Sequence, residues 1–374
     1  MVGFFEEFMR KRISILLLTA LVFVLNACSP KLELFKETFY GTFDTSIGYL
    51  SYARNKEDFE KQYKALQDEF TRLHKLYDNF HTYEGINNIK TINDNAGKGP
   101  IEVDKDLFSV IKFSIDNYEK TDGKLNIAMG AVIKLWTNAR NHNVDPSLSL
   151  GNKQAEIPDE EKIIPSDEEL AEAGKHSNIK DVVLDEKNMT VELKDPKMSL
   201  DLGAVGKGYA TELVAKKLES IGVKNASINA GGNIRSIGTP GDGRDKWGIG
   251  IQNPNLESSE SLEVLFIGQT SVVTSGDYQR YFEKDGIRYH HIIDPKTLKP
   301  AGEFNSVTIV TPNSGVADYL STVIFLSSKE DAERIIKEFD DVKVLWNSEK
   351  EGKTFTPELA QYMKSQGAKA SQPK

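Results

Sequence analysis

The stretch that decides the fold is residues 198–238, MSLDLGAVGKGYATELVAKKLESIGVKNASINAGGNIRSIG. Three glycines interrupt the chain soon after its apolar start: Gly203, Gly206 and Gly208. From Tyr209 the apolar residues recur at helical spacing, and Gly222 is placed to end that helix before a short strand at 226–229. We therefore expect strand, glycine loop, helix and strand, with backbone amides at the helix N-terminus presented to an anion.

Neither of two familiar phosphate-binding loops accounts for these glycines. A P-loop requires four residues between its first Gly and its Gly-Lys pair, followed by Ser or Thr, and residues 203–208 lack both features. A dinucleotide fingerprint requires a third glycine and an acidic residue about twenty positions later, and both are missing. Two readings stay open: a tight strand-to-helix turn, or a loop whose backbone approaches a ligand closely.

The composition is that of a globular protein. Of its 374 residues, 39% are hydrophobic and 28% are charged, enough for one large core or two smaller ones. The net charge of −9 argues against a surface that binds nucleic acid.

The chain opens with a targeting segment. Basic residues at 9–12 precede an apolar run at 13–25 that is too short for a relaxed transmembrane helix. The run ends in Leu-Asn-Ala-Cys, which resembles a bacterial lipoprotein box, and Cys28 is the only cysteine. We expect a signal peptide over 1–28, lipidation of Cys28, a tether over 29–37, and anchoring on the extracytoplasmic face of the cell membrane.

The remaining pattern predicts an α+β fold of antiparallel sheets with packed helices, in a domain over 38–350. Helices are expected at 56–77, 107–121, 166–173, 318–325 and 329–339. Strands are expected as a pair or a bulged strand at 39–53, as a hairpin within 179–200, and at 247–252, 262–267 and 304–310. Residues 125–136 are apolar enough to be buried, 137–178 are polar and are expected to form a surface insertion, and 351–374 are expected to be a polar tail.

A histidine pair marks one candidate site. The segments TSGDY at 274–278 and YHHIIDP at 289–295 combine hydroxyls, aromatic rings and imidazoles. His291 precedes two isoleucines at the border of a buried strand, an environment that tunes an imidazole for general base catalysis. The alternative is a structural histidine bonded to a carbonyl. His290 is expected to face the other way and to be exposed.

A carboxylate and a hydroxyl mark a second candidate site. Asp318 and Thr322 are four residues apart, so they lie on one face of a helix, and such hard oxygen ligands suit Mg²⁺. The alternative is that Asp318 merely caps the helix.

Together these motifs resemble those of the ApbE family, the FAD:protein FMN transferases. The family's elements are matched, in its order, by DLGAVGKGYA at 201–210, GGNIR at 231–235, TSGDY at 274–278, HIIDP at 291–295 and ADYLST at 317–322. Tyr40 stands near the start of the similarity, which covers about residues 38–345. The resemblance implies a fold similar to the T-fold, and transfer of FMN from Mg²⁺-bound FAD to a threonine hydroxyl of an exported or membrane flavoprotein, releasing AMP.

The resemblance also implies roles for particular residues. Asp318 and Thr322 match the side-chain metal ligands, Gly206 and Ser321 match positions that approach the metal through backbone, and His291 matches the base. Flavin or nucleotide contacts are matched by Tyr40, Tyr83, Lys124, Leu125, Asn126, Gly203, Tyr209 and Ile293. Two departures stand out: Asn126 replaces a common Asp, and Leu298 replaces a common Gly.

Two other functions are compatible with the sequence. In an FAD pyrophosphatase, water would replace the threonine, and free FMN and AMP would leave. A lipoprotein that binds flavin without catalysis would carry the same targeting signal, but it would need neither a metal pair nor a base.

Overall fold

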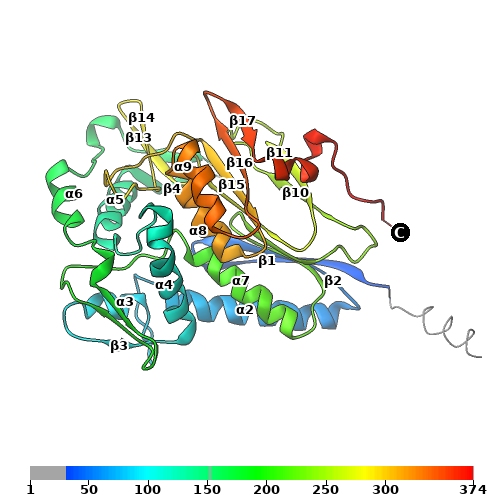
Figure 1. The fold of residues 1–374 in the computed structure, drawn as a ribbon, viewed down its shortest axis with the longest axis horizontal. Helices are drawn as coiled ribbons and strands as arrows, with labels where there is room; N and C mark the ends of the chain where they lie inside the picture. Colours follow the sequence, from blue (N-terminus) through cyan, green and yellow to red (C-terminus); the bar gives the residue numbers. More distant parts are fainter. Residues whose placement is uncertain (1–30, 151–152, 374) are drawn as a thin grey trace, which may run out of the picture.

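The computed structural model describes residues 31–150 and 153–373. Its centre is an eight-stranded sheet with the strand order β1-β2-β8-β9-β12-β15-β16-β17, in which every neighbouring pair is antiparallel (Figure 1). The strands are β1 (Glu33–Thr42), β2 (Thr45–Ala53), β8 (Asn225–Ala230), β9 (Asn233–Gly238), β12 (Ser271–Gly276), β15 (Ser306–Thr311), β16 (Lys343–Ser348) and β17 (Gly352–Phe355). The predicted α+β class with antiparallel sheets is confirmed.

Helices cover one face of this sheet and form the main core with it (Figure 1). They are α2 (Lys56–Tyr77), α4 (Lys105–Tyr118), α7 (Gly206–Ser220), α8 (Ser314–Phe325) and α9 (Lys329–Ile335). Helix α2 occupies the predicted residues because Asn55 caps its first turn and Leu66, Phe70 and Leu73 recur on its fully buried side. The main core therefore holds α7 and α8 rigidly against the sheet.

The opposite face is covered by a second, smaller core. The hairpin of β10 (Trp247–Ile251) and β11 (Glu263–Ile267) packs there with a 3-10 helix (Pro357–Tyr362). The prediction of a polar tail over 351–374 is wrong in this respect. Strand β17 joins the sheet, and Leu359 and Met363 are completely buried among apolar side chains of the second core.

A third core lies beside the first and includes much of the predicted insertion. It joins α5 (Gly130–Asn143), α6 (Asp167–Gly174), β13 (Tyr281–Lys284) and β14 (Ile287–His290). Residues 137–178 are therefore not simply a surface insertion, because α5 runs through residue 143 and Leu170 of α6 is buried in this core. The remaining elements are α3 (Ile89–Asp94), β3 (Ile101–Glu102), β4 (Val144–Leu150), β5 (Lys153–Glu156), β6 (Val182–Asp185) and β7 (Thr190–Leu193).

The predicted signal peptide and the predicted lipidation site, Cys28, lie outside the described residues. The tether predicted over 29–37 is too long, because β1 begins at Glu33 and pairs there with Ala53 of β2. Within residues 31–150 and 153–373, no helix combines the length and the apolar character needed to cross a membrane.

Candidate active site

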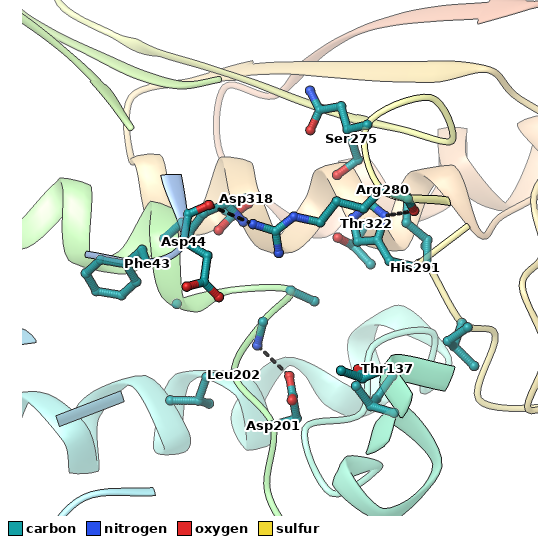
Figure 2. Close-up of a pocket in the computed structure, with 18 of the residues that line it drawn as sticks. Phe43, Asp44, Thr137, Asp201, Leu202, Ser275, Arg280, His291, Asp318 and Thr322 are labelled. Carbon is teal, nitrogen blue, oxygen red and sulfur yellow. Dashed lines mark hydrogen bonds between the residues drawn. The ribbon is translucent and has the colours of Figure 1, made fainter. Parts of the chain in front are cut away.

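A cavity of about 540 Å³ lies between the main core and the third core, and Figure 2 shows part of its lining. That volume is within the range of roughly 300–1,000 Å³ typical of small-molecule sites. The side contributed by α7 and α8 is called the helix wall: Gly206, Lys207, Asp318 and Thr322. The side contributed by α5 and the β13–β14 segment is called the hairpin wall: Trp136, Arg140, Arg280, Tyr289 and His291.

The helix wall depends on a close approach of α7 to α8. The Gly208 N–H donates to Asp318 Oδ2 at 2.7 Å. A Cβ at position 208 would lie 2.3 Å from the Asp318 Cβ and 2.4 Å from the Ser314 carbonyl oxygen, so only glycine fits. Helix α7 begins at Gly206, earlier than predicted, and Ser199 before it makes only an isolated bridge to Met129 rather than a strand. The glycine loop therefore serves helix packing as well as the cavity.

Asp318 lies inside α8 and is not its cap. The helix begins at Ser314, capped by Asn313, so Asp318 and Thr322 are one turn apart within it and both line the cavity. Burial raises the pKa of Asp318, while the Lys207 charge and the Gly208 N–H act in the opposite direction. A buried carboxylate of this kind is stabilised by a nearby cation.

The oxygen atoms around Asp318 fit a divalent cation. The Asn233 side chain hydrogen-bonds the carboxylate, while its own Oδ1 is buried without a hydrogen-bond partner in the described structure. With Thr322, these are the hard oxygen donors that Mg²⁺ prefers. The described residues contain no cluster of three or more His, Cys, Asp or Glu suited to a metal, so such a site would also need backbone oxygens. The Ser321 hydroxyl donates to the Asp318 carbonyl at 2.9 Å and lies 2.7 Å from Ser275 Oγ, and Ser321 itself is outside the cavity lining.

The hairpin wall presents His291 with one nitrogen free. Its Nδ1 lies 3.2 Å from the Arg280 carbonyl oxygen, and because a carbonyl only accepts, Nδ1 carries the proton (Figure 2). None of the described residues is hydrogen-bonded to Nε2, and the ring is open to the cavity. The hydrogen bond to a carbonyl that was expected of a structural histidine is therefore present. The same bond leaves Nε2 unprotonated and able to accept a proton.

The surroundings keep this imidazole neutral. The ring is exposed to the cavity, but desolvation by the surrounding walls, followed by the positive charges of Arg280 and Lys207, lowers the pKa of His291 to about 3. The prediction that His290 is exposed and faces away is wrong. His290 is half-buried, lines the cavity, and packs its ring edge against Phe325 with 5.6 Å between centroids. Strand β14 ends at His290, so strict alternation does not continue through His291.

An aromatic stack on the hairpin wall was not predicted. Tyr289 stacks between Trp136 and Phe282, with ring centroids 5.8 Å and 5.2 Å apart respectively. The Trp136 indole N–H donates to the Leu298 carbonyl at 2.8 Å, which fixes the ring. All three rings line the cavity and make this part of the wall apolar. Tyr289 adjoins the histidine pair in sequence, and this adjacency was the available signal.

Two further features of the lining were also missed. The turn between β1 and β2, at Phe43 and Asp44, has positive φ at both residues and borders the cavity. Asp201 lies across from Asp318, accepts from Gly203 N at 2.7 Å and Asn79 Nδ2 at 2.8 Å, and has a pKa raised by burial. The cavity thus holds a second carboxylate, half-buried, beside the glycine loop.

The comparisons with known proteins agree with this geometry. Residues 43–346 match the ApbE family. The chain belongs to the ApbE family. It is 31% identical over 322 residues to an FAD:protein FMN transferase of Treponema pallidum, covering 82% of this chain and 84% of that protein. Another FAD:protein FMN transferase, from Klebsiella pneumoniae, is 30% identical over 286 residues, covering 76% of this chain and 82% of the relative.

Solved ApbE structures share the fold. The ApbE protein of Thermotoga maritima superimposes with a TM-score of 0.73 at 28% identity, covering 88% of this chain and 99% of that one. The flavin transferase ApbE of Vibrio cholerae has a TM-score of 0.71 at 22% identity, covering 88% of this chain and 100% of that one, a likeness of fold alone.

The residues matched to ApbE flavin contacts divide into two groups. The structure places five at the cavity: Lys124, Leu125, Asn126, Gly203 and Ile293. It places three outside the lining: Tyr40, Tyr83 and Tyr209. Tyr40 is 75% exposed on β1, the Tyr83 hydroxyl donates to Asp78 at 2.7 Å, and the Tyr209 ring packs on Phe113. Their expected contacts with flavin are therefore not supported by the described geometry.

The two departures from the ApbE pattern have structural consequences. Leu298 adopts a left-handed φ of 59°, which explains why glycine suits this position. Its side chain packs against Gly174 of α6, so the third core accommodates the leucine. Asn126 donates to the Ser177 carbonyl at 2.7 Å and accepts from Ala128 N at 2.9 Å. Asn126 thereby ties the segment before α5 to the one after α6.

Proposed function

We propose that this protein transfers FMN from FAD to a threonine hydroxyl of an acceptor protein in a Mg²⁺-dependent reaction that releases AMP. The observation that carries the proposal is the placement of Asp318, Thr322 and His291 in the lining of one cavity, with His291 beside Thr322 in Figure 2. The relatives named FAD:protein FMN transferase support the overall reaction. The oxygen donors of the lining support the metal, and the acceptor threonine is what the resemblance to the ApbE family implies.

The reaction requires little covalent chemistry from the protein. The threonine oxygen forms a bond to the FMN phosphorus, the bond from that phosphorus to the bridging oxygen breaks, and AMP leaves with the electron pair. His291 accepts the hydroxyl proton at Nε2, because its Nδ1–H is already committed to the Arg280 carbonyl. A general base of this kind contributes about 10²- to 10⁴-fold in rate.

Asp318 and Thr322 would hold the metal, together with backbone oxygens of Gly206 and Ser321. When bound, Mg²⁺ neutralises charge on the diphosphate and orients it. The low exposure of Asp318, 4%, excludes water from the carboxylate and strengthens its attraction for a cation. The aromatic stack makes part of the hairpin wall apolar, which suits the flavin ring.

The deciding experiment is to incubate the protein with FAD, MgCl₂ and a candidate exported flavoprotein, then measure intact masses and nucleotides. An acceptor heavier by one FMN less one water, with equimolar AMP, is the expected result. Free FMN and AMP without an adduct would instead identify a pyrophosphatase. Unchanged FAD would identify a flavin-binding protein without catalysis.

We also propose that the protein is exported and anchored by a lipid on Cys28, which follows an apolar segment ending in Leu-Asn-Ala. This location would bring it to exported or membrane flavoproteins. Cys28→Ser should prevent lipid labelling and leave an unprocessed precursor or a released protein. Unchanged labelling and membrane fractionation of that variant would rule out Cys28 as the anchor.

A further inference from the structure

Two arginines of the hairpin wall lack carboxylate partners. Arg140 projects from α5, and Arg280 lies between β12 and β13. Neither forms an ion pair within the described residues, where Arg280 donates to the Asp44 carbonyl at 3.1 Å and Arg140 reaches only the Asn141 side chain at 3.4 Å. Figure 2 shows Arg280 extending across the cavity toward Asp44.

This contrasts with all other arginines that the structure describes. Each of the others has a carboxylate oxygen within 4 Å: Arg54, Arg72, Arg235, Arg244, Arg288 and Arg334. The chain therefore pairs its arginines with acids everywhere except at the cavity. An absence of pairing confined to one site indicates that the missing anion comes from a ligand.

The two guanidinium groups also act on each other. Burial, and then the charge of Arg280, lower the pKa of Arg140, while the charge of Asp44, which also lines the cavity beyond ion-pair distance, acts in the opposite direction. Like charges held together in a partly desolvated site are unfavourable unless an anion lies between them. Lys207 of the helix wall adds a third positive charge that faces the same space and also has no ion pair among the described residues.

We propose that Arg140 and Arg280 form a clamp for the diphosphate of a flavin dinucleotide, in the cavity that Asp318 also lines. A guanidinium has five N–H donors in a planar fork that matches phosphate oxygens, and Arg280 uses one nitrogen, Nη2, to reach the Asp44 carbonyl. The Arg280 backbone carbonyl meanwhile orients His291. One residue thus positions both the phosphate and the base. The identity of the ligand rests on the proposed function, whereas the preference for a phosphate rests on the unpaired charges.

The test compares FAD, FMN and riboflavin, because riboflavin has the same ring but no phosphate. Affinities are measured by fluorescence titration without metal or acceptor, for the wild type, Arg140→Met and Arg280→Met. Each variant should bind FAD and FMN about tenfold to a hundredfold more weakly, as expected for lost charge-assisted hydrogen bonds, and should bind riboflavin unchanged. Rising salt should weaken wild-type binding of FAD but not of riboflavin.

Arg288→Met is the matched control. Arg288 belongs to the same hairpin but lies outside the cavity lining and is already paired with Glu283 at 3.2 Å and Asp277 at 3.7 Å. This variant should bind all three flavins like the wild type. Arg140→Lys and Arg280→Lys keep one charge with fewer donors, so they should recover part of the lost FAD affinity while melting like the wild type.

Two results would overturn the clamp. One is unchanged FAD and FMN affinity in both methionine variants. The other is an equal loss for riboflavin that the lysine variants do not relieve, which would show that the arginines shape the cavity rather than bind phosphate. Because these titrations need no turnover, a wild-type protein that binds FAD through the arginines yet transfers no FMN would refute the proposed function and leave the clamp intact.

Discussion

The two walls of the cavity are built differently. The helix wall consists of two helices within the main core, locked by the contact of Gly208 with Asp318. The hairpin wall belongs to a smaller core, and its strands form a separate two-stranded sheet. A hydrogen bond from Arg280 to Asp44 links it across the cavity to the β1–β2 turn. Smaller cores with fewer buried contacts open more readily. We therefore expect the helix wall, where we propose the metal, to be the more rigid one, and the hairpin wall to open more easily to an acceptor.

The largest effect is expected on the helix wall, from Asp318→Asn. The amide keeps an oxygen for the Gly208 N–H but removes the charge that a cation requires. Mg²⁺-dependent release of AMP from FAD should fall below detection. The melting temperature should not fall, because burial already disfavours the ionised carboxylate. Cleavage of FAD at the wild-type rate in Mg²⁺ would show that this wall does not hold the metal.

On the hairpin wall, His291→Ala should reduce FMN transfer by about 10²- to 10⁴-fold while leaving FAD affinity near normal, since the removed imidazole acts only on the proton. The measurement is the FMN mass adduct on the acceptor against time. His290→Ala is the control: it loses the contact with Phe325 but should retain most transfer. Equal losses in both variants would point to local unfolding of the hairpin wall, and full transfer by His291→Ala would place the base elsewhere.

The next expected effect is on stability and compares two glycines of α7. A methyl group at Gly208 would overlap Asp318 and the Ser314 backbone, so Gly208→Ala should lower the free energy of unfolding by about 1–3 kcal/mol. A Cβ at Gly206 would lie 3.4 Å from Tyr77 and 3.5 Å from Leu202, which are ordinary contact distances. Gly206→Ala should therefore change the free energy of unfolding by less than about 0.5 kcal/mol. Urea unfolding measures both. Similar values for the two variants would mean that the helix wall is not tightly locked.

The difference between the walls also explains what the sequence could predict. Helix α2 and the Asp318–Thr322 pair follow from regular spacing within one helix, because side chains three or four residues apart share a face. Arg140 and Trp136 could not be assigned to the site, because long-range packing of α5 against β13 and β14 brings them there. The burial of Leu359 and Met363 could not be predicted, because two apolar residues in a polar stretch do not define a helical or strand period.

Tyr40 illustrates a different limit of sequence analysis. Its match to the ApbE pattern implied a flavin contact, but the structure places its side chain outside the cavity lining. The pairing of β1 with β2 shifts register between Phe39 and Thr42, and Gly41 has a φ of 94°. Phe39 packs on Phe70, so strand alternation turns Tyr40 outward, and the chain beyond the irregularity brings Phe43 to the cavity. A bulged strand was one of the two possibilities expected over 39–53, but the residue pattern did not predict which side chains it would bring to the cavity.

The smallest predicted effect is the change in the FMN transfer rate with pH. It tests whether the surroundings of His291 lower the pKa of this base. An ordinary histidine, with a pKa near 6.5, would lose its base form as the pH falls below that value. His291 has a pKa of about 3, so it stays neutral, and the transfer rate at saturating Mg²⁺ should change by less than about twofold between pH 5.5 and 7.5. Between the two pKa values the unfolded chain binds more protons than the folded one, so stability should decline as the pH falls through this window, and less steeply in His291→Ala. A rate that fell in proportion to acidity below pH 6.5 would show that the ring titrates normally, and that neither desolvation nor the neighbouring cations lower its pKa.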